Sequence, residues 1–416
     1  MSAAVLCIGT ELTRGEIVNT NASWLAESLT DRGLEVVAIE AIPDDRQRII
    51  DTLHRMGSQH TVIVCTGGLG PTTDDITSEC VANVLDVPLE RDEASLEAIR
   101  TRMARFGRNM AASNEKQADF PRGARVLPNR KGTAPGFSLA LGHARAFFLP
   151  GVPREMKTMF GELVSPELEE FVRDAIHQVR LKTFGMTESG VNDNLAGIEA
   201  EHGVTLAYRA HFPEIEVKVH ARAADPTDAA NRARTAADAV IARLGGDVVY
   251  GEGDVTFAEQ LGRLLVERHL TLAVAESCTG GTVARLLTER SGASDFFLGG
   301  AVTYANTAKT TLLGVNDELL ATNGAVSSEV ARAMAEGARS ALGADLALAL
   351  TGIAGPSGGT EEKPVGLVHF AVASKDGTSD RQMVFPGTRT QIRDLAAFAG
   401  LALVRKVVRE GHDEAT

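Results

Sequence analysis

The residues with the clearest chemical potential lie in the segment AVAESCTGG, residues 273–281. An apolar run at 270–275 predicts a buried strand, and a helical pattern begins at Thr282. This order places the hydroxyl of Ser277 or the thiol of Cys278 at a helix N-terminus, where free backbone N–H groups favour negative charge. Such a site suits a nucleophile that attacks a carbonyl, or a bound phosphate. A tight turn that merely contains a serine is the alternative.

A second set of candidate residues follows two strands predicted in the first third of the chain. The strands at 5–8 and 62–66 each lead into a loop with glycine and acidic residues. In an open α/β sheet, ligands bind beyond the carboxyl ends of the strands, where glycine loops bring N–H groups close to phosphates. Carboxylates there suit Mg²⁺ or Mn²⁺, so the pattern predicts a metal-dependent phosphoanhydride site; a glycine-rich turn with an aspartate cap is the alternative. The candidates are Glu11, Gly67, Gly68, Gly70, Asp74 and Asp75.

A further loop adds a cation to this set. KGTAPG, residues 131–136, offers Lys131 among small residues, and a simple turn is the alternative interpretation. The glycine-rich loop at 66–75 is neither a Walker A sequence nor a G-x-G-x-x-G fingerprint. Those two nucleotide-binding motifs are therefore not indicated here.

The elements that position these loops alternate between strand and helix. This alternation in the first third, and again from residue 255, predicts mostly parallel sheets covered by helices on both faces. Between them, an alternating strand at 215–220 and an Ala-rich helix at 227–244 predict a small α+β module. Residues 251–254, GEGD, are typical of a linker, and a helix is expected at 73–85. The expected domains span 1–170, 178–250 and 255–416.

Composition limits the classes of partner. The net charge is −13 with a pI near 5.3, and aromatic residues make up only 5%, which opposes direct binding to nucleic acid or anionic membranes. No apolar stretch approaches the length of a membrane helix. None of the 4 cysteines forms a C-x-x-C pair, so we expect reduced thiols in the cytoplasm.

Several long motifs together resemble the CinA family of competence/damage-inducible proteins. In the first third they are CIGTELTRGEIVNTNASWL, TGGLGPTTDDITSE, NRKGTAPGF and LPGVPREM. In the last third they are AESCTGG, TYANTAKTTLLGV, NGAVSSEVA, LTGIAGPSGGTEEKPVG and PGTR. The resemblance implies an α/β fold with three parts: a three-layer N-terminal domain similar to molybdopterin-binding domains, a small α+β KH-like middle domain, and a C-terminal α/β amidase domain.

For the N-terminal domain, the resemblance implies an ADP-ribose pyrophosphatase that releases AMP and ribose 5-phosphate. Its cofactor would be a divalent metal, Mg²⁺, Mn²⁺ or Co²⁺. Asp75 occupies the place of the acidic residue in the active loop of that fold, with Asp74 and Glu11 as further metal ligands. Asn19 is a candidate contact to ribose or phosphate, although an asparagine near a helix start is more often a cap.

For the C-terminal domain, the resemblance implies a deamidase that converts nicotinamide mononucleotide (NMN) and water to nicotinate mononucleotide and ammonia, without a metal. Ser277 is then the nucleophile, with Tyr304 and Lys309 as its polar partners. Thr351 and Arg389 would shape the substrate pocket. The remaining candidate contacts are the loop glycines Gly280, Gly281 and Gly352.

The chemistry leaves two questions open. Lys309 can act as the base if burial lowers its pKa, and a solvated helix lysine is the alternative. His369, inside a predicted strand, reads as a sheet residue rather than as the base. Physical reasoning does not choose between Ser277 and Cys278, because a thiol at a helix N-terminus is also activated; the resemblance chooses Ser277.

The middle domain gives little sign of nucleic-acid binding. Residues 180–250 hold eight Lys/Arg and ten Asp/Glu, a net charge of −2, and lack the G-x-x-G loop of RNA-binding KH domains. We therefore expect a spacer or dimer-forming element, and the family resemblance implies a homodimer. A molybdopterin-binding protein and a non-catalytic partner in DNA uptake or repair are the alternative functions.

Overall fold

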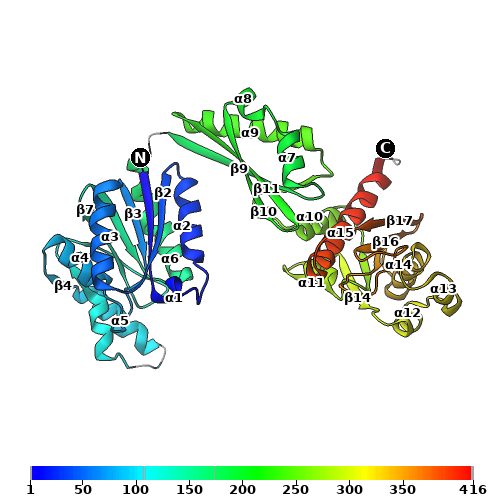
Figure 1. The fold of residues 1–416 in the computed structure, drawn as a ribbon, viewed down its shortest axis with the longest axis horizontal. Coiled ribbons are helices and arrows are strands. Elements are labelled where there is room, and N and C mark those ends of the chain that lie inside the picture. Colours follow the sequence, from blue (N-terminus) through cyan, green and yellow to red (C-terminus); the bar gives the residue numbers. More distant parts are fainter. Residues whose placement is uncertain (1, 106, 108, 173, 414–416) are drawn as a thin grey trace. The chain divides into compact units, whose positions relative to one another are not determined.

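The computed structural model describes residues 2–105, 107, 109–172 and 174–413, with side chains through 410 (Figure 1). The chain folds into two compact units, Met1–His177 with Arg222–Ala230, and Gln178–Ala221 with Asn231–Thr416. The outer ends of the expected first and third domains, residues 1 and 414–416, lie outside the described residues.

The first unit is built on a six-stranded sheet in the order β2-β1-β3-β8-β7-β6. The first four strands run parallel, as predicted, whereas β7 and β6 add an antiparallel edge that the alternation did not indicate. The strands are β1 (Ser2–Ile8), β2 (Glu35–Ile42), β3 (Val62–Thr66), β6 (Arg125–Leu127), β7 (Gly136–Leu141) and β8 (Ala144–Leu149). A separate pair joins β4 (Leu89–Arg91) and β5 (Asp119–Pro121).

Helices cover both faces of this sheet, which makes three layers. The period of two along β1 sends Leu6 to the core beneath α3 and α4, and Val5 to the core beneath α2 and α6. In Figure 1, α2 and α3 lie on opposite sides of the strands. The helices are α1 (Thr10–Thr13), α2 (Thr20–Thr30), α3 (Arg46–Gln59), α4 (Thr77–Leu85), α5 (Glu93–Arg105), η1 (Ala112–Ala118), α6 (Pro153–Met159), η2 (Phe160–Val164) and η3 (Ser165–Phe171).

The middle domain has a four-stranded sheet in the order β10-β11-β9-β12. The expected strand at 215–220 lies within β11, and the expected helix at 227–244 lies within α9, whose alanines pack on the sheet. The elements are β9 (Ala175–Thr183), α7 (Glu188–Asn194), α8 (Ile198–His202), β10 (Val204–His211), β11 (Glu214–Ala223), α9 (Pro226–Leu244) and β12 (Val249–Glu252).

The C-terminal domain has a five-stranded sheet in the order β14-β13-β15-β16-β17. Strand β13 pairs in parallel with β14 and β15, and β16 and β17 continue the sheet in antiparallel fashion. Its strands are β13 (Leu272–Glu276), β14 (Phe297–Val302), β15 (Leu346–Gly352), β16 (Leu367–Ser374) and β17 (Gly377–Val384). Its helices are α10 (Phe257–Glu267), α11 (Thr282–Thr288), η4 (Ala293–Asp295), α12 (Asn306–Leu313), α13 (Asp317–Asn323), α14 (Ser328–Leu342) and α15 (Arg389–Asp413).

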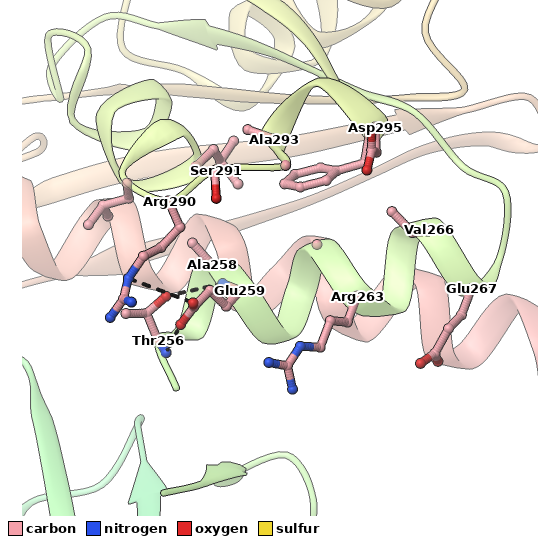
Figure 2. Close-up of a pocket in the computed structure, with 15 residues that line it drawn as sticks. Thr256, Ala258, Glu259, Arg263, Val266, Glu267, Arg290, Ser291, Ala293 and Asp295 are labelled. Carbon is pink, nitrogen blue, oxygen red and sulfur yellow. Dashed lines mark hydrogen bonds and ion pairs between the residues drawn. The ribbon is translucent and has the colours of Figure 1, made fainter. Parts of the chain in front are cut away.

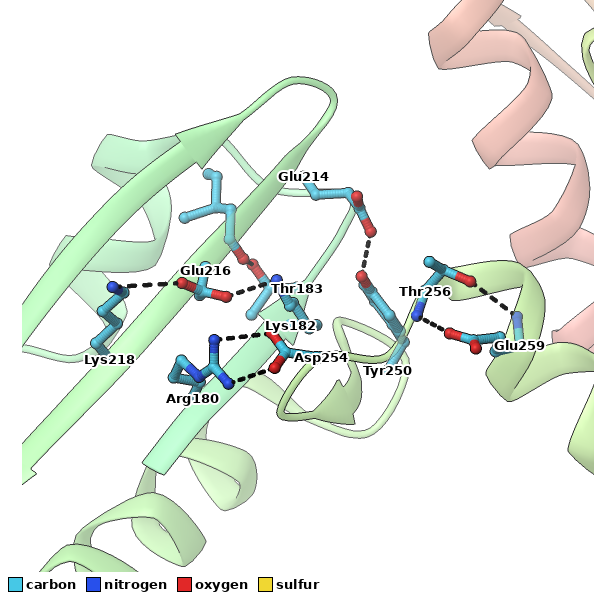
Figure 3. Close-up of polar contacts among 11 residues, drawn as sticks. Arg180, Lys182, Thr183, Glu214, Glu216, Lys218, Tyr250, Asp254, Thr256 and Glu259 are labelled. Atoms are coloured by element: carbon cyan, nitrogen blue, oxygen red, sulfur yellow. Dashed lines mark hydrogen bonds and ion pairs between the residues drawn. The ribbon is translucent and has the colours of Figure 1, made fainter. Parts of the chain in front are cut away.

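The linker expected at 251–254 is instead part of a packed junction within the second unit (Figure 3). Both carboxylate oxygens of Asp254 accept a hydrogen bond of 2.8 Å from Arg180 of β9. The ring of Phe184 lies 5.4 Å from that of Phe398 and 6.0 Å from that of Phe257. The sequence suggested a linker, but Gly251 and Glu252 belong to β12 and Asp254 makes a bidentate ion pair with Arg180.

Candidate functional site

Ser277 lies where β13 ends between two parallel neighbours. Its backbone N–H donates to the Leu350 carbonyl at 3.0 Å, which extends the pairing of β13 with β15 by one residue. Gly280 and Gly281 then adopt φ of 60° and 94°, the left-handed region that glycine reaches without strain. The chain therefore turns sharply from the strand into α11, with the Ser277 side chain at the turn.

Lys309 of α12 is buried beside this serine, with a relative exposure of 1%. Its ammonium donates to Ser277 Oγ at 3.2 Å, to the Thr303 carbonyl at 2.7 Å and to the Tyr304 carbonyl at 3.4 Å. Burial lowers the pKa of Lys309, because removal from water disfavours the charged form. After loss of a proton, the two carbonyls can hold the two N–H groups while the lone pair faces Ser277 Oγ. This geometry suits a general base.

Cys278 occupies a different environment from its neighbour Ser277. Its side chain packs in the hydrophobic core among residues of α10, α11 and α15. Burial raises the pKa of Cys278 to about 12, so the thiolate is disfavoured. The geometry therefore favours Ser277 over Cys278 as the nucleophile, a choice that the sequence left open.

The backbone N–H groups in the first turn of α11 are not free, contrary to the expectation from the sequence. The carboxylate of Glu276, which is fully buried, accepts hydrogen bonds from the N–H groups of Gly281 at 2.9 Å, Val283 at 3.1 Å and Ala284 at 2.8 Å. A carboxylate is the natural partner of these groups and of the positive end of the helix dipole. Sequence reasoning passed over Glu276, although an acidic residue directly before the turn was a usable signal.

Arg393 is a second residue that sequence reasoning missed. From α15, its Nε and Nη2 donate to the Thr279 carbonyl at 3.1 and 2.8 Å, and Nη2 also donates to Thr282 Oγ1 at 3.2 Å. These partners lie more than a hundred residues earlier in the chain, so local sequence patterns do not reveal them. Arg393 holds the turn from the helix side.

Tyr304 and Arg389 form an exposed pair of side chains, which we call the rim. The Tyr304 side chain is 63% exposed, and its hydroxyl accepts a hydrogen bond of 3.0 Å from Arg389 Nη2. Arg389 Nη1 also donates to the Gly355 carbonyl at 2.7 Å. Tyr304 reaches Lys309 through its backbone carbonyl rather than through its phenol. The phenol of Tyr304 therefore pairs with Arg389, and the contact to Lys309 is made by the backbone.

Thr351 and Gly352 end β15 beside the turn. Thr351 is buried, and its hydroxyl donates to the Ala325 carbonyl at 2.6 Å, so its hydroxyl proton is already used within the protein. A Cβ on Gly352 would come within 2.5 Å of the Leu367 carbonyl, so this glycine permits close strand packing. His369 pairs with Thr351 across the sheet, and burial lowers its pKa.

A cavity of about 390 Å³ in the same domain lies elsewhere, between α10 and the segment after α11 (Figure 2). Glu259 accepts a hydrogen bond of 2.8 Å from Thr256 N and lies 3.6 Å from Arg290. The Thr256 hydroxyl in turn accepts from Glu259 N at 3.2 Å, and these two reciprocal bonds form a capping box at the start of α10. Neither Ser277 nor Lys309 lines the cavity, so its polar groups serve the helix rather than the chemistry described above.

The glycine-rich loop of the first unit packs closely on the strand ends. Gly67 N–H donates to the Leu149 carbonyl of β8 at 3.0 Å, and a Cβ on Gly67 would overlap the Ile8 carbonyl of β1. A Cβ on Gly68 would overlap the Thr77 hydroxyl, which itself donates to the Gly67 carbonyl at 3.1 Å. Because of these contacts, α4 begins at Thr77, four residues later than expected from the sequence.

Asp75 and Asp74 sit differently in this loop. Asp75 Oδ2 accepts hydrogen bonds from Thr72 N at 2.9 Å and Thr72 Oγ1 at 2.5 Å, and lies against Gly70. Asp74 is exposed, and hydrogen bonding from Thr72 lowers its pKa. Asp75 and Gly70 line a cavity of about 120 Å³ together with Lys116.

Glu11 lies on α1, directly after β1. Next to it, Thr10 donates through N and Oγ1 to Asp44 at 2.7 and 3.0 Å, which adds an acidic residue that sequence reasoning missed. In the part of the chain that the structure describes, no three His, Cys, Asp or Glu side chains are grouped so as to hold a metal. Oxygen donors on neighbouring strand ends still suit Mg²⁺ when substrate phosphates supply further ligands.

The two remaining candidates of this unit are placed by local hydrogen bonds. Asn19 caps α2 by accepting from Ala22 N at 3.0 Å, which is the alternative role considered from the sequence. Lys131 is exposed, and its backbone N–H donates to Asn129 Oδ1 at 2.9 Å. The Lys131 side chain thus adds an exposed positive charge to this loop. The Asn19 side chain is used as a helix cap.

Among the described helices, none has both the length and the apolar character needed to span a membrane.

Comparisons with known proteins identify the family. The profile of the CinA C-terminal domain matches residues 254–408, that of a probable molybdopterin binding domain matches 4–170, and that of the damage-inducible protein CinA KH domain matches 178–251. A CinA-like protein of Anaeromyxobacter dehalogenans is 44% identical over 412 residues, covering 98% of this chain and 100% of the relative. One of Geobacter sulfurreducens is 43% identical over 413 residues, covering 98% and 99%.

A solved structure is also similar to part of the chain. The competence/damage inducible protein CihA from Agrobacterium tumefaciens is 42% identical, covers 36% of this chain and 96% of its own, and has a TM-score of 0.35. The full-length relatives and the three profiles confirm the family and fold class predicted from the motifs. The chain belongs to the CinA family, with a molybdopterin-binding-like domain, a KH-like domain and a CinA C-terminal domain in that order.

Proposed function

We propose that the chain is a bifunctional hydrolase of pyridine-nucleotide fragments. Its C-terminal domain would convert NMN and water to nicotinate mononucleotide and ammonia, and its N-terminal domain would split ADP-ribose into AMP and ribose 5-phosphate. The observation that carries the first activity is the 3.2 Å contact between Lys309 Nζ and Ser277 Oγ in a buried setting. The family resemblance supplies the two substrates.

Acylation begins when Ser277 Oγ forms a bond to the amide carbon of NMN and its proton passes to Lys309 Nζ. The amide oxygen carries the developing charge and needs N–H donors from the turn. The C–N bond then breaks, and the proton moves from Lys309 to the leaving group, which departs as ammonia. The product on the protein is an ester between Ser277 and the nicotinate group.

Deacylation repeats the same roles with water. Lys309 takes a proton as the water oxygen bonds to the ester carbon, and it returns that proton to Ser277 Oγ when the ester bond breaks. Nicotinate mononucleotide leaves, and both side chains return to their starting states. Arg389 with Tyr304 at the rim, and Thr351 with the 352–359 loop, are the proposed substrate contacts, a guanidinium being well suited to phosphate.

For the N-terminal domain, Asp75, Asp74 and Glu11 are the proposed metal ligands, and the backbone of Gly67, Gly68 and Gly70 would lie along the diphosphate. A divalent cation bound there would offset the phosphate charge and polarise the attacking water. Lys131 would add a mobile positive charge for the substrate. The glycines support this role because the loop lies directly on the strand ends, where ligands bind in such folds.

The test is a pair of assays on the purified full-length chain. Ammonia release from NMN is measured with a chelator present, and AMP release from ADP-ribose is measured with Mg²⁺, Mn²⁺ or Co²⁺. We expect both activities, the first independent of metal. If no ammonia is released from NMN, the proposed deamidase activity is refuted. If no AMP is released with any of the three metals, the proposed pyrophosphatase activity is refuted.

The molybdopterin-binding profile over residues 4–170 favours a second candidate for the same N-terminal site. A bound pterin would be detected by mass spectrometry of the purified protein. Its presence, together with no release of AMP, would assign the site to pterin binding.

A further inference from the structure

We propose that Glu276 is a positioning residue for the reaction at Ser277, fixing the turn so that the N–H groups of Cys278 and Thr279 serve as the oxyanion donors. This inference rests on the proposed deamidase. It starts from a fully buried carboxylate, adjacent in the chain to the nucleophile, that accepts three hydrogen bonds from the backbone of α11.

The remaining N–H groups of the turn narrow the choice of oxyanion donors. Ser277 N donates to Leu350, Gly280 N donates to the Ser277 carbonyl, and Thr282 N donates to the Thr279 carbonyl. The N–H groups of Gly281, Val283 and Ala284 donate to Glu276, and that of Arg285 donates to the Gly281 carbonyl, so between 277 and 285 only those of residues 278 and 279 remain. Within this described segment, the N–H groups of Cys278 and Thr279 have no backbone oxygen acceptor, and their partner is the thiol of Cys278, which is a weak acceptor. The residue after a nucleophile on a strand-to-helix turn is a common oxyanion donor.

The opposite side of the turn is held by Arg393, which binds the Thr279 carbonyl twice. The peptide planes of the turn are therefore held by Glu276 at the helix end and by Arg393 at the Thr279 carbonyl. Such fixed donors act without reorganisation when charge develops, which is why oxyanion sites contribute strongly to rate.

The carboxylate also has a consequence for binding. A helix N-terminus normally attracts phosphate, but here its N–H groups already bind a negative charge. The phosphate of the substrate is thereby kept away from α11, and the neutral amide is left to approach Ser277. Glu276 would thus orient the substrate as well as fix the conformation of the turn.

The test replaces Glu276 by glutamine in the full-length chain. Glu276→Gln keeps the shape but places an NH₂ group against one backbone N–H donor. We expect kcat for NMN to fall about 100-fold with KM within about threefold, because a group that acts in the transition state is disturbed. Glu259→Gln is the matched control, since Glu259 also accepts a backbone hydrogen bond at a helix start of this domain but lies away from Ser277. It is expected to leave both parameters unchanged.

A second readout does not depend on catalysis. Burial is the main cause that raises the pKa of Cys278, and the nearby Glu276 carboxylate raises it further, so Glu276→Gln should speed alkylation of Cys278 by iodoacetamide, followed by mass spectrometry of that peptide. A thermal melt accompanies each variant, and Glu276→Asp, which keeps the charge but is shorter, replaces the glutamine variant if that fails to fold.

The outcomes separate the two hypotheses. A lower kcat with a retained KM and faster labelling supports the positioning role. A lower melting temperature with kcat within twofold of wild type at 25 °C overturns it. If the wild-type chain releases no ammonia, the proposed function has failed, and unchanged labelling of Cys278 would then overturn the positioning role separately.

Discussion

The turn at Ser277 and the loop at Asp75 follow the same rule of placement but differ in how complete they are. Both lie at the carboxyl end of a parallel strand in an α/β sheet. At Ser277 the partners Glu276 and Lys309 are buried and hydrogen-bonded within the protein. At Asp75 the neighbouring Asp74 is exposed, and the described acidic residues do not form a three-residue metal cluster.

This difference separates a preassembled site from one that a ligand must complete. A buried lysine and a fixed turn can act on an amide without further parts. Carboxylates spread over loops need a cation and phosphate oxygens before they form a reactive centre. We therefore expect changes at Ser277 to act on deamidation alone, and changes at Asp75 and removal of metal to act on ADP-ribose hydrolysis alone.

The largest effect is expected for Ser277→Ala. Loss of the nucleophile should lower kcat for NMN by about 10⁴-fold or more, with ADP-ribose hydrolysis unchanged. Ammonia and AMP release from the same preparation measure both. Ser291→Ala, an exposed serine of the same domain, is the control. Equal loss of both activities would point to misfolding instead of a lost nucleophile.

Replacement of Lys309 should have the next largest effect and change the pH profile. Because burial lowers its pKa, the neutral base forms at a lower pH than for an ordinary lysine. The value of kcat/KM for NMN should rise with pH through that lowered pKa, and Lys309→Met should remove this limb and cost about 10²–10⁴-fold. Lys406→Met, which alters an exposed helix lysine, serves as control. A wild-type profile that falls with pH over this range would contradict the role of Lys309 as base.

A smaller effect is expected for Asp75→Asn, which tests the incomplete site. ADP-ribose hydrolysis should fall roughly 100-fold, and a chelator should abolish it, because a metal ligand is lost or emptied. Ammonia release from NMN should not change in either case. Asp86→Asn, at the end of α4, is the control. Sensitivity of ammonia release to the chelator would break the contrast between the two regions.

The smallest effect is expected for Cys278→Ala. The thiol is buried and its pKa is about 12, so deamidation should stay within about threefold of wild type, with about 1 kcal/mol of stability lost from the core. Kinetics and a denaturant titration measure the two quantities. Loss of deamidation comparable to that of Ser277→Ala would reopen Cys278 as the nucleophile.

Much of the fold follows from local pattern. The alternation of strand and helix, with apolar runs at β1, β3 and β13, predicted the parallel centres of both sheets. The antiparallel edges were missed because β6 is three residues long and β17 is largely exposed, so neither carries an apolar signature. The supposed linker at 251–254 is fixed by partners distant in sequence, such as Arg180.

The candidate site shows the same division. Residue type and a strand-turn-helix pattern led to Ser277, and the family resemblance led to Lys309, which the structure places in contact with it. The pattern also predicted free N–H groups at the start of α11. This was wrong, because the Glu276 carboxylate accepts hydrogen bonds from them. Arg393 was missed because its contacts to the turn depend on tertiary packing.

The central claim, that Ser277 forms an ester with the substrate, is tested most directly with hydroxylamine. In a metal-free reaction of the wild-type chain with NMN, hydroxylamine should compete with water for the ester and yield the hydroxamate of nicotinate mononucleotide along with ammonia. We expect Ser277→Ala to form neither product. Continued release of ammonia by Ser277→Ala, or release by the wild type with no hydroxamate at any hydroxylamine concentration, would contradict it.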